Sequence, residues 1–173
     1  WLDEVRSKSG FTDEIEIFDG QILSGGLKFS IVENSTLDES RYKFSYRKGS
    51  TEILIKTAVW SDSVLLSEVE RAELDKVVVK ALRHKAKRTL LLKMKVISEE
   101  MGADYGSVTI RNTSSRWGSC SSQNDINLSL WLMVLPDELV DYVIVHELAH
   151  TRFKHHGKDF WDEVARWCPN HKI

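Results

Sequence analysis

His146-Glu147-Leu148-Ala149-His150 is the stretch that decides the fold, because it fits the pattern H-E-x-x-H. Residues four apart on an α-helix lie one above the other, so both imidazoles point the same way and can hold one ion. Zinc binds imidazole nitrogens at about 2.0–2.1 Å, and this pair can supply two of them. Glu147 is poorly placed as a third ligand, but it can reach a metal-bound water and accept its proton.

A third ligand is expected downstream, because catalytic zinc sites typically have three protein ligands and an open position for water. His156 lies beyond the expected end of the helix, and Gly157 allows a sharp turn that brings it back to the metal. His155 is the alternative. We prefer His156 because it adjoins the glycine.

The helix that carries the motif is expected to begin at Leu135-Pro136-Asp137-Glu138, with proline and acids in its first turn, and to run to about Phe153. Apolar residues lie almost all round it, which indicates burial. Two surface histidines flanking a glutamate are the alternative interpretation. Buried histidines, however, need partners, and a metal is a good one.

Two strands are predicted before the helix, at 107–111 and 126–130, because polar and apolar residues alternate there. Strand 126–130 could form a cleft edge to which an extended peptide adds by backbone pairing. Between the strands, we favour packing for Trp117 and a turn at Gly118. The alternative is a cleft in which Arg116 or Ser119 polarises a substrate carbonyl.

A last helix follows, with Phe160, Val164 and Trp167 as its buried residues, and it ends before Pro169. Phe160, Trp161 and Trp167 are expected to pack rather than bind. Cys120 is interpreted as a small core residue. Carboxylates are expected to orient the ligating histidines, and the candidates are Asp141, Asp159, Asp162 and Glu163.

Residues 1–63 predict a β-rich lobe, because alternating segments separated by glycine-containing turns favour an antiparallel meander. The period then changes to that of an amphipathic helix. Ser67 and Glu70 form a capping-box signature, and Gly102 is the expected stop. We therefore divide the chain into a lobe at 1–63 and a core at 64–173, which together make one continuous domain.

Composition excludes several classes of protein. Hydrophobic residues make up 42% of the 173 residues and charged residues 29%, which is typical of a globular chain. No apolar run approaches the ~18 residues that a spanning helix needs, and two cysteines are too few for a disulfide framework. We expect a cytoplasmic protein without membrane contact. Residues 80–95 carry seven Lys/Arg and no acid, so nucleic acid is an alternative partner.

The chain resembles the YgjP-like metallopeptidases, relatives of the SprT and Spartan-type zinc proteases. The resemblance rests on the H-E-x-x-H motif with His156, on Phe160-Trp161, and on two further runs, Ser115-Arg116-Trp117-Gly118-Ser119-Cys120-Ser121-Ser122 with Ile126-Asn127-Leu128, and Cys168-Pro169. Asn124-Asp125 departs from a Gly-Asn turn that is common in the family. This departure should alter a hairpin tip and leave the metal site unchanged.

The resemblance implies an α+β fold with a zincin-like minimal core, made of a small antiparallel sheet plus an active-site helix, preceded by the β-rich lobe and long helix. It also implies a zinc metallopeptidase with His146, His150 and His156 as metal ligands. From the residues themselves, Glu147 is the expected general base. The resemblance implies peptidase chemistry, so a protein or peptide is the expected substrate. The alternative function is a non-catalytic binding module that zinc holds together. Such a module would associate with nucleic acid through the basic helix.

Overall fold

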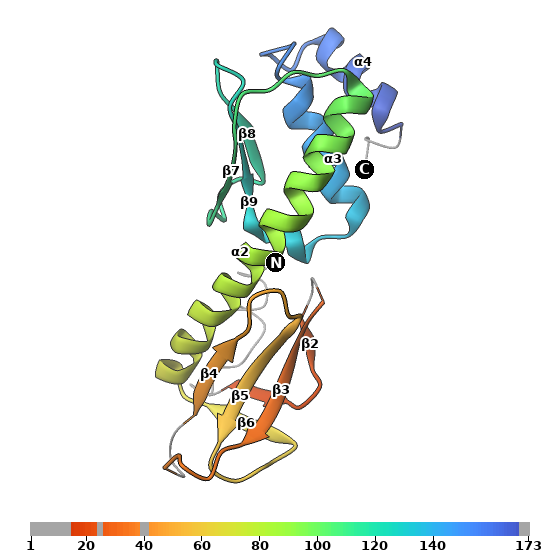
Figure 1. Ribbon diagram of the computed structural model, residues 1–173. Coiled ribbons are helices and arrows are strands. Elements are labelled where there is room, and N and C mark those ends of the chain that lie inside the picture. Colours follow the sequence, from red (N-terminus) through yellow and green to blue (C-terminus); the bar gives the residue numbers. More distant parts are fainter. Residues whose placement is uncertain (1–14, 24–25, 39–41, 170–173) are drawn as a thin grey trace. The chain divides into compact units, whose positions relative to one another are not determined.

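The computed structural model describes residues 15–23, 26–38 and 42–169, and the predicted strand and turn content of residues 1–63 is tested only within these ranges (Figure 1). The chain forms two compact units, Trp1–Ala81 and Leu82–Ile173, and the boundary falls inside one long helix. Each unit is described by itself. Within the described residues, no helix is long and apolar enough to cross a membrane.

The first unit contains two small sheets. The two-stranded sheet pairs β1 (Ile15–Phe18) with β6 (Ser63–Leu66), and the other has the order β2-β3-β5-β4. Its strands are β2 (Ile22–Leu23), β3 (Leu27–Glu33), β4 (Lys43–Tyr46) and β5 (Glu52–Thr57). The expected antiparallel meander is wrong at its centre, because β3 and β5 pair in parallel. Both carry buried apolar rows, so they occupy the middle of the sheet, whereas the more polar β4 lies at the edge.

Helix α2 (Glu68–Met101) confirms the predicted long helix. Its start is a capping box, in which Glu70 accepts hydrogen bonds from the backbone and hydroxyl of Ser67 at 3.0 and 2.7 Å. Its end is set by Gly102, whose φ of 59° is a left-handed conformation that favours glycine. The buried side chains follow the helical period, at Leu74, Leu82, Ala86, Leu90 and Met94.

In the second unit, β7 (Val108–Arg111), β9 (Ile126–Ser129) and β8 (Gly118–Cys120) form a sheet in that order. The sheet was expected to be antiparallel, but only β8 and β9 pair that way, and β7 pairs with β9 in parallel. β9 follows β7 and β8 in the sequence but lies between them in the sheet. This strand holds the most deeply buried side chains of the sheet, Ile126 and Leu128.

The 3-10 helix η1 (Leu130–Val134) leads into helix α3 (Asp137–Ala149), and α4 (Lys158–Trp167) completes the unit. Two details of α3 differ from expectation. Pro136 is the N-cap rather than a first-turn residue, and the helix ends at Ala149 instead of near Phe153 because the chain turns at residues 150–152. The fold is α+β as predicted, and the small sheet with α3 fits a zincin-like minimal core.

Candidate metal centre

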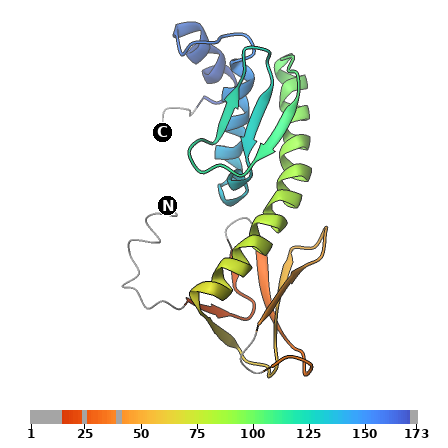
Figure 2. The ribbon, with the colours of Figure 1, turned by 90° about the vertical axis from the view of Figure 1, so that its left-hand side faces the viewer.

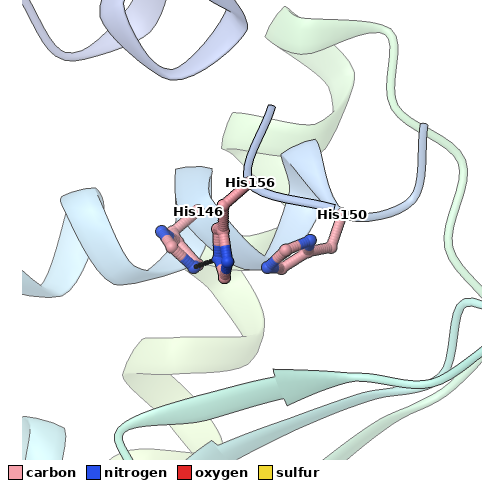
Figure 3. Close-up of side chains that lie close together, drawn as sticks. All are labelled: His146, His150 and His156. Atoms are coloured by element: carbon pink, nitrogen blue, oxygen red, sulfur yellow. Dashed lines mark hydrogen bonds between the residues drawn. The ribbon is translucent and has the colours of Figure 1, made fainter. Parts of the chain in front are cut away.

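Three histidines converge in the second unit (Figure 3). Their ligand nitrogens, from His146, His150 and His156, all lie within 4.8 Å of one another. His146 Nε2 and His156 Nε2 are 3.2 Å apart. Nitrogens about 2.0–2.1 Å from a tetrahedral zinc are separated by roughly 3.3 Å, so this spacing suits two ligands of one ion. His155, the alternative third ligand, does not belong to the cluster within the described residues.

Local structure places each of the three rings. His146 lies in the last turn of α3 and His150 is the residue that caps it, so the helical spacing puts both on one face. The His150 Nδ1 atom is 3.0 Å from the carbonyl of Phe153, which fixes the ring and directs its other nitrogen towards the cluster. His156 stands just before Gly157, the N-cap of α4.

Aromatic side chains from α4 support the cluster. Phe160 is fully buried, and its ring centroid lies 4.9, 4.5 and 4.7 Å from those of His146, His150 and His156. Trp161 stacks on His156 at 5.7 Å and is 37% exposed. The predicted packing of Phe160 and Trp161 is therefore observed. The rings that they contact are those of the candidate metal ligands.

The protonation states favour metal binding. Burial, together with the neighbouring His150 and His156, lowers the pKa of His146 to about 4. Burial also lowers the pKa of His150. Because a metal ligand must be a neutral imidazole, these two side chains are ready to bind at neutral pH.

Glu147 lies beside the cluster and is only 6% exposed. Burial raises its pKa to about 7, while the positive charge of Arg116 opposes the rise. Its Oε2 atom and the Nδ1 atom of His146 are buried without a hydrogen-bond partner among the described residues. Buried polar atoms without partners are costly, and a water held beside the three histidines would give the Glu147 oxygen a partner. The residues present therefore fit a metal ion.

Gly118 brings strand β8 against Glu147. A Cβ placed on this glycine would lie 2.5 Å from Glu147 Oε1 and 2.7 Å from its Cγ, which no ordinary contact allows. The predicted turn at Gly118 is wrong, because the residue is the first of a strand and is needed for close approach. In the sequence, the only signal is a glycine in the segment between the expected strands 107–111 and 126–130.

Two further expectations about this region are corrected. Trp117 was expected to fill the core, but it is 46% exposed, and its neighbour Gly118 is the residue that lies against Glu147 of α3. Strand 126–130 was expected to be the cleft edge, but β9 is the central strand and is paired on both sides. The edge strands are β7 and β8, each of which pairs only with β9 among the described residues, and β8 is the one that lies against Glu147.

Three of the four carboxylates that were expected to orient the histidines are engaged elsewhere. Asp141 accepts from Lys93 at 2.7 Å, Glu163 from Arg152 at 2.8 Å, and Asp162 from Lys158. A backbone carbonyl supplies the hydrogen bond at His150 instead. Cys120 is half-buried, and the amine of Lys154 lies 3.8 Å from its sulfur. Burial raises the pKa of Cys120, which suits an unreactive thiol.

The fold and the site together define a class of protein: a metallopeptidase with an H-E-x-x-H helix and a third histidine after it. A family model described as YgjP-like, metallopeptidase domain, matches residues 28–173, and the chain belongs to this family. The resemblance found in the sequence is thereby confirmed. A search of curated protein sequences gave no match.

Two solved structures are similar to part of the chain, and both are metallopeptidase zymogens. Jannalysin of Methanocaldococcus jannaschii has a TM-score of 0.42 and 22% identity, over 45% of this chain and 80% of the other. Abylysin of Pyrococcus abyssi has a TM-score of 0.41 and 24% identity, over 45% and 78%. The family assignment rests on the family model.

Proposed function

We propose that this metallopeptidase is zinc-dependent, with His146, His150 and His156 as the ligands and Glu147 as the general base. The observation that carries the proposal is the convergence of three imidazole nitrogens within 4.8 Å beside a buried carboxylate. Three imidazole ligands suit zinc, although nitrogen ligands are shared by several transition metals. When bound, zinc would acidify a water and polarise the scissile carbonyl.

The chain's own residues would perform the proton transfers. Glu147 accepts a proton from the attacking water and later delivers it to the leaving amine. Gly118 leaves the space in which the Glu147 carboxylate lies against β8. The unpaired edge of β8 would hold the substrate, because an extended peptide can add to a sheet edge by backbone hydrogen bonds.

The alternative function is a structural zinc site in a binding module. Structural sites are closed by four protein ligands, whereas catalytic sites keep one position open. Within the described residues, the cluster contains three candidate ligands and no fourth His, Cys, Asp or Glu. This count favours the catalytic proposal.

The two free cysteines, Cys120 and Cys168, suit a reducing compartment such as the cytoplasm.

Replacing Glu147 by Gln tests the proposed chemistry. The amide keeps the shape of the side chain but cannot accept the proton, so we expect peptide hydrolysis to fall by at least about 10²-fold. Metal content, measured by inductively coupled plasma mass spectrometry, should stay near one zinc per chain. His156→Ala is the matched control and should lose metal as well as activity. Unchanged cleavage of an unfolded protein substrate by Glu147→Gln would refute the general-base assignment.

A further inference from the structure

A groove of about 930 Å³ lies in the second unit, and none of the three histidines lines it. Its lining residues come from α2 and from all three strands of the sheet. Figure 2 shows that α2 runs beside this sheet, along its β7 edge. Four cationic side chains line it, namely Arg83 and Lys87 from α2, Arg111 from β7 and Arg116 from the following segment.

The floor of this basic groove is the polar face of the sheet. Thr109, Asn127 and Ser119 are paired across the three strands, so their side chains lie on one face in a row. Asn127 links the row, because it accepts from Arg111 Nε at 3.1 Å and donates to Ser119 Oγ at 3.3 Å. Helix α3 packs on the opposite face, where Gly118 meets Glu147.

Within the described residues, the lining of the groove offers no acid to offset its positive charge, although the charge of Arg116 also acts on Glu147. None of the lining residues is an aspartate or glutamate. Within the described residues, no ion pair joins Arg83, Lys87 or Arg116 to a carboxylate, and Arg111 has an amide as its partner.

Other cations of the same unit behave differently. Lys93 pairs with Asp141 at 2.7 Å, Arg152 with Glu163 at 2.8 Å, and Lys158 with Asp162. A charged run on a helix is often no more than a solvated face. Here, however, α2, β7 and the segment after β7 bring cations together in one hollow that lacks any acid. Such a hollow raises the local concentration of anions.

We propose that the basic groove binds single-stranded nucleic acid through its phosphodiester backbone. Cations distributed along a hollow match a chain of regularly spaced phosphates, and the threonine, serine and asparagine groups of the floor can bond phosphate and sugar oxygens. A duplex fits less well, because α2 lies against the sheet and its groove-lining face cannot enter a major groove. Recognition is through the backbone, so little sequence preference is expected.

Fluorescence anisotropy with a labelled oligothymidine of twelve nucleotides tests the proposal on the full chain. The double variant Arg83→Ala/Lys87→Ala should bind on the order of tenfold more weakly at 0.1 M salt, and the slope of log K against log salt should become about 1.4 shallower. Arg88→Ala/Lys95→Ala is the matched control, since it removes two charges from the same helix outside the groove. It should retain nearly all binding.

Lys87→Glu is a second variant at an exposed position, and it should weaken binding further while leaving the thermal unfolding temperature unchanged. A duplex of the same length should bind more weakly than the single strand, and a polyglutamate competitor should displace it poorly. Three results would overturn the proposal: no measurable binding, equal weakening by the control pair, or tighter binding of the duplex or of polyglutamate. Retained peptidase activity in Arg83→Ala/Lys87→Ala would show that the groove is separate from the metal centre.

Discussion

At Gly118 the absence of a side chain gives the Glu147 carboxylate its place, since a Cβ would lie 2.5 Å from Glu147 Oε1. Gly118→Ala should therefore displace the carboxylate, lower stability by about 1–3 kcal/mol, and reduce peptidase activity much more than metal content. Activity assays, metal analysis and urea unfolding measure the three effects.

Gly157→Ala is the matched control for that variant. Nothing lies within 4 Å of a Cβ at Gly157, and its φ of −76° suits any residue. Parent-like activity is therefore expected for Gly157→Ala. If Gly118→Ala were as active as the control, the close approach of β8 to Glu147 would have no functional importance.

The buried Glu147 also predicts a pH dependence of stability in the metal-free protein. Its pKa is raised from 4.5 to about 7, so folding disfavours the charged carboxylate. Below pH 4.5 the carboxyl is protonated in both the folded and the unfolded chain, so it causes no loss of stability. As the pH rises from 4.5 to about 7, the free energy of unfolding falls by about 3 kcal/mol. Metal-free Glu147→Gln lacks this cost. Relative to the parent, it should gain stability between pH 5 and pH 8 in urea titrations, and parallel curves would contradict this prediction.

Arg152 joins three elements of the second unit and shows how the site is held. Its guanidinium donates to the carbonyls of Met101 and Gly102 at the end of α2, and to Glu163 of α4. Arg152→Ala should lower the free energy of unfolding by about 1–2 kcal/mol, because it leaves helix-terminal carbonyls without donors. Lys158→Ala breaks an exposed pair and should change the free energy of unfolding much less. Equal losses in chemical denaturation would contradict the link.

The elements that the sequence predicts well are those encoded by neighbouring residues. The capping box at Ser67, the stop at Gly102 and the i, i+4 pair of His146 and His150 are all local patterns. The order of strands is not local. Segments 107–111 and 126–130 were recognised as strands, but their alternation does not state which of them becomes central or whether they pair in parallel.

The predictions of a turn at Gly118 and of core packing for Trp117 were wrong for the same reason. Whether a glycine forms a turn or admits a neighbour depends on what packs against it, and Glu147 lies 29 positions away in the chain. The exposure of Trp117 likewise depends on what packs beside it. The orienting group of His150 is a backbone carbonyl, which no side-chain pattern can reveal.

For the whole molecule, the division into Trp1–Ala81 and Leu82–Ile173 predicts where metal binding is felt. The three histidines belong to the second unit, so zinc should protect backbone amides there and leave those of β1 to β6 unchanged. Hydrogen–deuterium exchange with and without a chelator measures this. Protection should concentrate in residues 146–164, because His156 ties the loop between α3 and α4 to the ion. Uniform protection of both units would contradict the expectation.

One edge of β8 is unpaired in the described part of the chain, and this edge has a consequence for what such an enzyme can cut. A polypeptide that docks there must offer free amides and carbonyls in extended form, and a chain already folded into its own helices or sheets has none to spare. Proteolysis by this route would discriminate by conformation rather than by amino-acid type. Nascent, damaged or heat-loosened proteins would be degraded, whereas their intact counterparts would survive unharmed in the same solution.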